Sequence, residues 1–89
     1  MDRKCYIISY QIISPRDTST IDEAIKSYGT WAQITETTWA VVTSSSASQV
    51  RDSLQTFLSP EDKIFIVRSG FEAAWKNVIC TSEWLKKNL

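Results

Sequence analysis

Apolar and polar residues follow two different periods along this chain, and the periods divide it into strands and helices. Residues 4–13, KCYIISYQII, carry apolar residues on both alternating faces, which is typical of a central strand covered on two sides. We therefore expect this strand at the centre of a sheet. Its two rows of side chains are Tyr6, Ile8 and Tyr10 on one face, and Cys5, Ile7, Ser9 and Gln11 on the other.

The next segment has the period of a helix. Thr20 and Glu23 have the spacing of a capping box, in which each side chain bonds a free backbone N–H of the first turn. Gly29 suits the position after a helix where the backbone needs a positive φ. A helix from Thr20 towards Gly29 is therefore predicted. Its apolar stripe is Ile21, Ala24, Ile25 and Tyr28.

Residues 30–43 are rich in Trp, Ile, Thr and Val, which favour a pleated and half-buried surface. They predict strands at 31–35 and 38–43, joined near Glu36 and Thr37. A second helix follows, with a capping box of Ser46 and Gln49, and it ends before Pro60. Its apolar stripe is Ala47, Val50, Leu54, Phe57 and Leu58.

The last third of the chain predicts one more strand and one short helix. Residues 62–68 contain four consecutive apolar residues, so we expect both faces of this strand to be covered. Ser82 is the expected cap of a final helix, with Lys86 and Lys87 in the last turn, where cations suit the helix dipole. The apolar side of that helix is Trp84, Leu85 and Leu89.

This order of elements predicts an α+β fold, namely a ferredoxin-like βαββαβ sandwich with a four-stranded antiparallel sheet. The first and third strands lie at its centre, and both long helices cover one face. We expect a single domain over residues 1–89, with a core at 3–69 and a short C-terminal helical tail at 70–89.

The second face of this sheet has no helix, although apolar residues point to it in either phase. Such a face is larger than the apolar patches of most soluble monomers. We expect it to be covered by a second subunit in a homodimer, which we favour, or by the C-terminal tail. The candidate residues are Ile7 or Ile8, Phe65 or Val67, and Trp39 or Ala40.

Composition removes several classes of function. Ten basic and ten acidic residues cancel, so no overall field attracts nucleic acid or an anionic membrane. No apolar run reaches the roughly 20 residues of a membrane span, and residues 1–10 lack a signal peptide pattern, so we expect a cytoplasmic protein. The chain has no His, which excludes His-based triads and His-ligated metals, and Cys5 and Cys80 are expected to be buried free thiols. No cofactor is predicted.

Several segments resemble the small bacterial SinR-like family over nearly the whole chain. They are the strand Tyr6–Ile12, Gly29-Thr30-Trp31-Ala32 with Gln33, the strand Asp62–Arg68, Glu72-Ala73-Ala74-Trp75 and Glu83-Trp84-Leu85-Lys86-Lys87. The strand patterns are more distantly similar to CRISPR-associated adaptation proteins and virulence-associated D ribonucleases. The resemblance implies a ferredoxin-like homodimer that packs sheet face to sheet face.

These relatives commonly end the first strand in Tyr-Asp, and the paired Asp residues are associated with divalent metal and nuclease activity in some members. This chain has Tyr10-Gln11 instead. An amide cannot act as a base and is a weak Mg²⁺ ligand, so a metal-dependent nuclease would need another carboxylate, of which Asp17 is the nearest. Tyr10, Gln11 and Asp17 are therefore weak catalytic candidates, and Mg²⁺ is expected only if such a site survives.

Other residues are candidates for binding. Ile7, Ser9 and Gln11 are the expected dimer interface. A basic ridge that contacts DNA or RNA phosphates would be formed by Arg16, Arg51, Arg68, Lys76, Lys86 and Lys87. The leading hypothesis is a non-catalytic nucleic-acid-associated or scaffold protein. A small-molecule-binding regulatory module and a metal-dependent nuclease are the alternatives, because fold alone does not decide between them.

Overall fold

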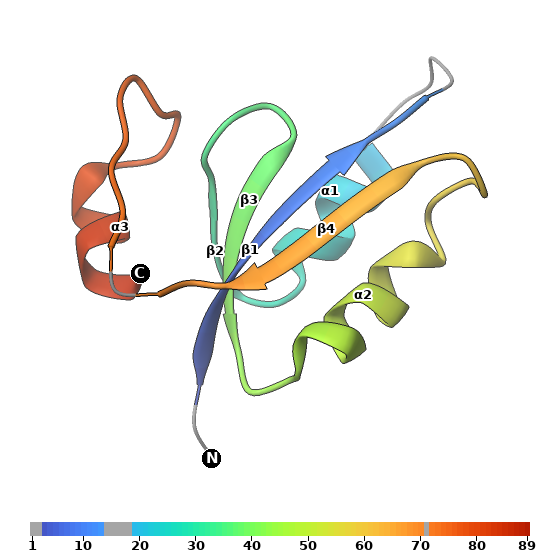
Figure 1. Ribbon diagram of the computed structural model, residues 1–89, viewed down its shortest axis with the longest axis horizontal. Helices are drawn as coiled ribbons and strands as arrows, with labels where there is room; N and C mark the ends of the chain where they lie inside the picture. The colour runs from blue at the N-terminus through green and yellow to red at the C-terminus, as the bar shows by residue number, and fades with distance from the viewer. Residues whose placement is uncertain (1–2, 14–18, 71) are drawn as a thin grey trace.

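The computed structural model describes residues 3–13, 19–70 and 72–89, which fold into one antiparallel sheet with helices (Figure 1). The sheet has four strands in the order β2-β3-β1-β4, so the predicted α+β class and the central places of the first and third strands are confirmed. In chain order the elements are β1 (Lys4–Gln11), α1 (Ser19–Lys26), β2 (Thr30–Gln33), β3 (Thr38–Thr43), α2 (Ala47–Gln55), β4 (Lys63–Arg68) and α3 (Ser82–Asn88).

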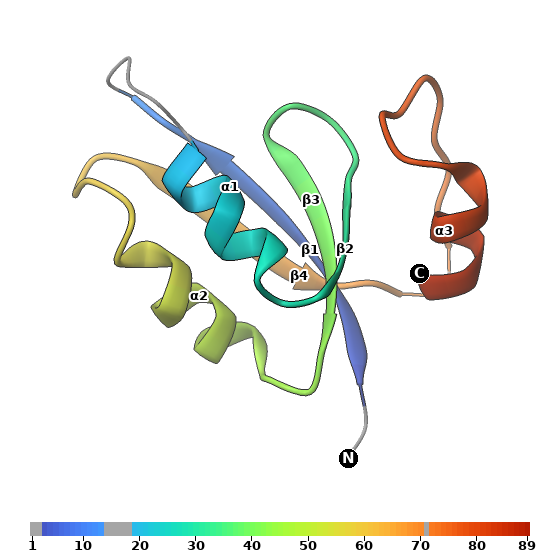
Figure 2. The same cartoon turned by 180° about the vertical axis from the view of Figure 1, so that it is seen from behind.

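The core lies between the sheet and the helices α1 and α2, which cover the same face (Figure 2). Ile8 of β1 pairs with Trp39 of β3 and with Ile66 of β4, which sets the register of the central strands. The row of Tyr6, Ile8 and Tyr10 faces the helices, and the row that contains the expected dimer interface lies on the other face. The buried core consists of Tyr6, Ile8, Tyr10, Ile21, Ile25, Trp39, Val41, Val50 and Leu54.

Local signals at the first two helices are mostly confirmed. Gly29 has a φ of 90°, a left-handed conformation that favours glycine, directly after α1. Helix α1 already includes Ser19, so Thr20 is a helical residue and not the predicted cap. In α2 the capping box is present: the Ser46 hydroxyl accepts from the Gln49 backbone N–H at 3.2 Å, and the Gln49 amide oxygen accepts from the Ser46 N–H at 2.8 Å.

The predicted ends of α2 and α3 were less accurate. Helix α2 stops at Gln55, so Phe57 lies beyond its end and is 41% exposed instead of completing the apolar stripe. The cap of α3 is Thr81, whose hydroxyl accepts from the Trp84 N–H at 3.2 Å. Ser82 is the first residue of the helix, and its hydroxyl accepts from the Trp75 indole N–H at 3.1 Å.

The C-terminal tail covers part of the second sheet face, on the side of β2. The backbone N–H of Ile79 donates to the carbonyl of Ile34 at 2.9 Å, which ties the tail to the end of β2. Ala32 and Ala40 pair across β2 and β3 on this face and are buried. Helix α3 accordingly lies beyond β2, at the opposite side of the sheet from β4 (Figure 1).

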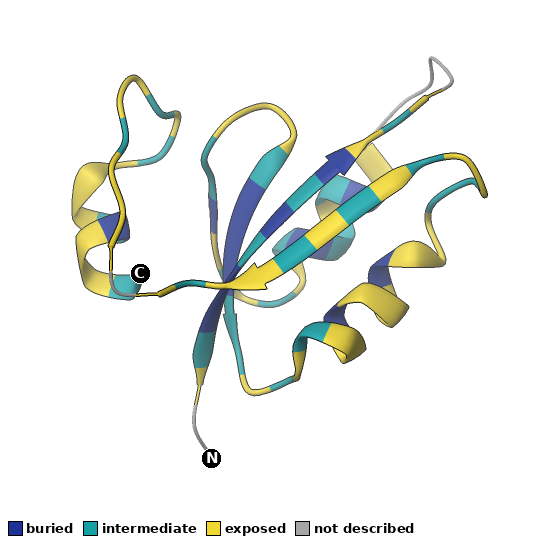
Figure 3. Cartoon of the chain, in the orientation of Figure 1, coloured by how far each residue is buried: buried dark blue, intermediate teal, exposed yellow. Residues whose placement is uncertain are grey.

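The tail does not cover β4. Phe65 is 65% exposed and Val67 is 44% exposed, so the expectation that both faces of this strand are covered was wrong for the single chain. Figure 3 shows the contrast, because the middle of β3 is buried while every residue of β4 is exposed or intermediate. The open face therefore has a covered half over β2 and β3 and an uncovered half over β4.

Candidate functional site

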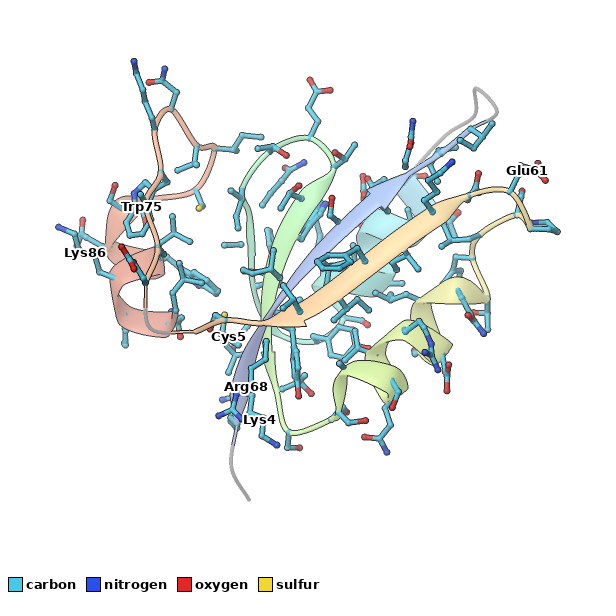
Figure 4. The ribbon with its side chains drawn as sticks, viewed as in Figure 1. Lys4, Cys5, Glu61, Arg68, Trp75 and Lys86 are labelled. Atoms are coloured by element: carbon cyan, nitrogen blue, oxygen red, sulfur yellow. The ribbon has the colours of Figure 1, made fainter. Side chains whose placement is uncertain are left out.

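A groove of about 370 Å³ separates the C-terminal tail from the open face of the sheet. Its wall on the sheet side includes Ile7 of β1 and Val67 of β4, and its wall on the tail side includes Trp75, Leu85 and Leu89. Most lining side chains are apolar. Arg68 and Glu72 also line the groove and carry opposite charges (Figure 4 labels Arg68 and Trp75).

Two features of the chain position the tail wall of this groove. The Ser69 N–H donates to the Cys5 carbonyl at 2.9 Å, so pairing with β1 continues one residue past β4 before the tail departs. The bond from the Trp75 indole to Ser82 then joins the loop to the first turn of α3. Because α3 presents the buried Leu85 towards this space, the tail forms an apolar wall.

The weak catalytic candidates are not brought together. Tyr10 is buried among the core residues, and its hydroxyl donates to Asp22 at 2.6 Å. Gln11 is exposed at the end of β1 and pairs with Lys63 of β4. Neighbouring strand residues point to opposite faces, so the Tyr10 and Gln11 side chains lie on opposite sides of the sheet. Asp17 lies outside the described residues.

The bond between Tyr10 and Asp22 was missed by sequence reasoning. Asp22 lies in the first turn of α1, where an acidic residue also suits the helix dipole. The helix dipole alone accounts for an acidic residue at position 22, so the sequence gives no sign of the contact with β1. Only the packing of α1 on the sheet reveals that contact. The bond satisfies a buried hydroxyl, which indicates a structural role for Tyr10.

The three predicted interface residues lie on one face but in different surroundings. Ile7 lines the groove beneath the tail. Ser9 is half-buried opposite Phe65 of β4, and Gln11 is exposed. The part of the predicted interface that stays open thus consists of Ser9 and Gln11, together with Phe65 and Val67.

The predicted basic residues are distributed over different parts of the molecule. Arg51 lies on α2, where its guanidinium forms an exposed ion pair with Asp52 at 2.9 Å. Arg68 ends β4, at the same end of the sheet as Lys4 (Figure 4). Lys76, Lys86 and Lys87 belong to the tail, and Arg16 lies outside the described residues. The described candidates therefore do not gather into one ridge within the single chain.

Within residues 3–13, 19–70 and 72–89, no group of three or more His, Cys, Asp or Glu side chains is placed to hold a metal ion. Among the helices of the same residues, none has the length and apolar character that a membrane crossing requires.

The two thiols differ in burial. Cys5 is buried on the open face of β1, whereas Cys80 is half-buried, and both are free. Burial raises the pKa of the Cys5 thiol, and a hydrogen bond with Ser69 partly offsets this rise. The prediction of two buried thiols thus holds for Cys5 alone.

The raised pKa of Cys5 predicts a loss of stability in alkali. The unfolded chain releases the thiol proton at a lower pH than the folded chain does, so the free energy of unfolding falls as the pH rises above the ordinary pKa of a thiol. The slope from this group is at most about 1.4 kcal/mol per pH unit. Urea unfolding from pH 7 to 10 should show a steeper decline for the wild type than for Cys5→Ala, and parallel curves would contradict the prediction.

Comparison with known proteins returned no match: no family model, no curated protein and no solved structure is similar to this chain. Two features of the chain itself point to function, namely the exposed apolar residues of β4 and the groove beneath the tail.

Proposed function

We propose that this chain is a homodimeric, non-catalytic protein with a ferredoxin-like fold, related to the SinR-like family, that acts as a scaffold. The strand order β2-β3-β1-β4, with α1 and α2 on one face, supports the ferredoxin-like assignment. The observation that carries the functional proposal is the exposure of Phe65 and Val67 on the uncovered half of the open face.

This uncovered half has the composition of a protein contact. Phe65 and Val67 supply apolar area at its centre, while Ser9, Gln11 and Lys63 supply polar groups around them. Interfaces commonly combine an apolar centre with a polar rim. A two-fold axis brings the same patch of two copies together, so each apolar side chain contributes twice to the contact.

The geometry favours a scaffold over an enzyme or a phosphate-binding protein. The Tyr10 hydroxyl is held by Asp22 on the helix side, away from Gln11, so these residues do not form a catalytic pair. The described basic candidates lie on α2, on β4 and on the tail, and Arg51 is already paired with Asp52. A nucleic-acid-associated role would require the dimer to align these cations, because phosphate binding needs several of them on one surface.

Sedimentation velocity of the wild-type chain tests the proposal. We expect a dimer at tens of micromolar protein, dissociating on dilution, and a strict monomer over this range would overturn it. Fluorescence anisotropy with labelled single- and double-stranded DNA and RNA, at about 50 mM salt, distinguishes a nucleic-acid-associated role from a scaffold role. Salt-sensitive binding would favour the nucleic-acid role, and its absence would favour the scaffold.

The groove supports a second candidate function, the binding of a small apolar molecule. Its volume of about 370 Å³ and its mainly apolar lining match small-molecule sites, which usually add a few polar groups for orientation. Ser69 and Glu72 line the groove and supply such groups here. This candidate corresponds to a regulatory module whose ligand also holds the tail in place.

A thermal-shift screen of metabolites checks this second candidate. A ligand that binds only the folded chain must raise the unfolding midpoint. The shift should disappear in Ala74→Trp, which fills the groove, and remain in Lys76→Trp, a tail position that does not line it. An equal shift in both variants would show that the ligand binds elsewhere.

A further inference from the structure

The groove beneath the tail has few polar side chains, and they determine which head group a ligand can carry. A ligand in a mainly apolar groove is oriented by a small number of polar contacts. Apart from Arg68 and Trp75, the polar side chains of the lining belong to Thr38, Ser69 and Glu72. The chemistry of these groups therefore predicts the class of ligand.

Arg68 borders the groove, but the register of the sheet directs its side chain elsewhere. Arg68 of β4 pairs with Tyr6 of β1, and Tyr6 is buried in the core on the helix side. Directly opposed residues of neighbouring strands lie on the same face, so the guanidinium also lies on the helix side. Figure 4 shows Arg68 at the end of the sheet where Lys4 lies, away from Trp75. Glu72 thus supplies the charge on the groove side.

The Glu72 carboxylate is available to a ligand. Glu72 lines the groove and is exposed, so it lies where the groove opens to solvent. Over residues 3–13, 19–70 and 72–89, its side chain takes part in no ion pair and no hydrogen bond. The apolar walls lower the local dielectric, which strengthens the attraction between this anion and a cation.

The two hydroxyls of the lining are left mainly as acceptors. The Thr38 hydroxyl donates to the Ser9 hydroxyl at 3.5 Å, and the Ser69 hydroxyl shares a hydrogen bond with the Cys5 thiol. A hydroxyl has one proton to donate and two lone pairs that accept. Both side chains can therefore still accept a hydrogen bond from a ligand.

Trp75 also favours a cation over an anion. Its indole N–H donates to the Ser82 hydroxyl at 3.1 Å, so this donor is already used. Its ring remains part of the groove wall. The face of an indole ring attracts ammonium groups through its quadrupole. The ring and the Glu72 carboxylate thus select the same sign of charge.

We propose that the groove binds a small primary amine in its ammonium form. The apolar body of the amine lies against Ile7, Val67 and Leu85, and the ammonium group binds Glu72. An ammonium group has three donors and no acceptor, which complements a wall whose polar side chains accept. This inference rests on the second candidate function, the binding of a small apolar molecule, and specifies the charge of that molecule.

Three probes with the same six-carbon chain test the choice of head group. They are n-hexylamine, 1-hexanol and hexanoate, at pH 7, where an alkyl amine is protonated like a lysine side chain. Each is titrated into the isotope-labelled full chain, and the NMR signal of the Trp75 indole N–H reports Kd. We expect hexylamine to bind about tenfold more tightly than hexanol, because its hydrogen bonds to the carboxylate are charge-assisted. Hexanoate should bind most weakly.

Glu72→Gln removes the charge and keeps the size of the side chain. We expect the Kd of hexylamine to rise about tenfold in this variant, while the Kd of hexanol stays unchanged. Glu83→Gln makes the same substitution in the first turn of α3, outside the lining of the groove, and should leave both values unchanged.

Several results would overturn the inference. They are equal affinities for hexylamine and hexanol, an equal effect of Glu72→Gln and Glu83→Gln, and the absence of any response at Trp75 to hexylamine. Equal binding of all three probes that Ala74→Trp abolishes would refute the preference for an amine and still support the groove as a small-molecule site. The metabolite screen and the sedimentation experiment decide the two proposed functions separately.

Discussion

Replacing Phe65 by serine is expected to weaken self-association about a thousandfold. Complete burial of a Phe side chain contributes up to about 3 kcal/mol, and Phe65 is 65% exposed in the single chain, so each copy contributes about 2 kcal/mol. Two symmetric copies contribute about 4 kcal/mol, and each 1.4 kcal/mol corresponds to a factor of about ten in Kd. Sedimentation equilibrium over a wide concentration range measures the change.

The matched control is Phe57→Ser. Phe57 is 41% exposed beyond the end of α2, outside the open face, so its loss should change Kd less than about threefold. Both variants should keep the circular dichroism spectrum of the wild type, because neither side chain belongs to the buried core. Equal effects of the two substitutions would show that general surface hydrophobicity, and not the β4 face, drives the association.

Replacing Trp39 by alanine is expected to lower the free energy of unfolding by about 3–5 kcal/mol. Trp39 is fully buried at the centre of the core, and removal of such a large side chain leaves a cavity that its neighbours fill only in part. A chain of this length has a total stability of roughly 4–13 kcal/mol. The variant should therefore lose a large share of its stability, which urea titration followed by circular dichroism would show as a lower unfolding midpoint.

Trp39→Phe distinguishes the contribution of the aromatic ring from that of the indole N–H, because it keeps a ring and removes the N–H. The indole nitrogen of Trp39 is buried and has no hydrogen-bond partner among the described residues, so the phenyl ring removes an uncompensated donor. We expect a loss of only about 1–2 kcal/mol, since most of the apolar volume is kept. A loss as large as that of the alanine variant would indicate that the nitrogen has a bonded partner in solution.

Trp31→Ala is the control for Trp39→Ala, because Trp31 is a similar side chain that is less buried. Its ring centre lies 5.5 Å from that of Trp39, and Trp31 is 36% exposed on the edge strand β2. Because part of its surface is already in water, Trp31→Ala should lower the free energy of unfolding by about two thirds as much as Trp39→Ala. An equal cost would mean that the pair is stabilised mainly by the contact between the two rings.

Local interactions explain what could be predicted from the amino acids alone. The capping box of Ser46 and Gln49 and the turn at Gly29 each depend on residues within a few positions of one another, so their signals are complete in the sequence. The alternation of Tyr6, Ile8 and Tyr10 with Ile7 and Ser9 likewise reveals the two faces of β1, because side chains of a strand alternate strictly. The class of fold, the order of elements and the central strands follow from these signals.

The candidate site depended on contacts between distant segments. Ser82 and Thr81 both have a hydroxyl suited to a helix cap, and in the structure Thr81 caps α3 while the Ser82 hydroxyl accepts from the indole of Trp75. Tyr10 and Gln11 were weak catalytic candidates because they are neighbours at the end of the first strand, yet Tyr10 points into the core towards Asp22. Such pairings are set by how helices pack on the sheet, which no local pattern encodes.

Only the tertiary structure determines which segment covers the second face of the sheet. The apolar pattern of β1, β3 and β4 predicts that this face needs a cover, because exposed apolar area is unfavourable in water. It does not say which segment supplies the cover, since the hydrophobic effect has no direction and both a tail and a second subunit satisfy it. The fold places the tail over β2 and β3 and leaves Phe65 and Val67 of β4 exposed.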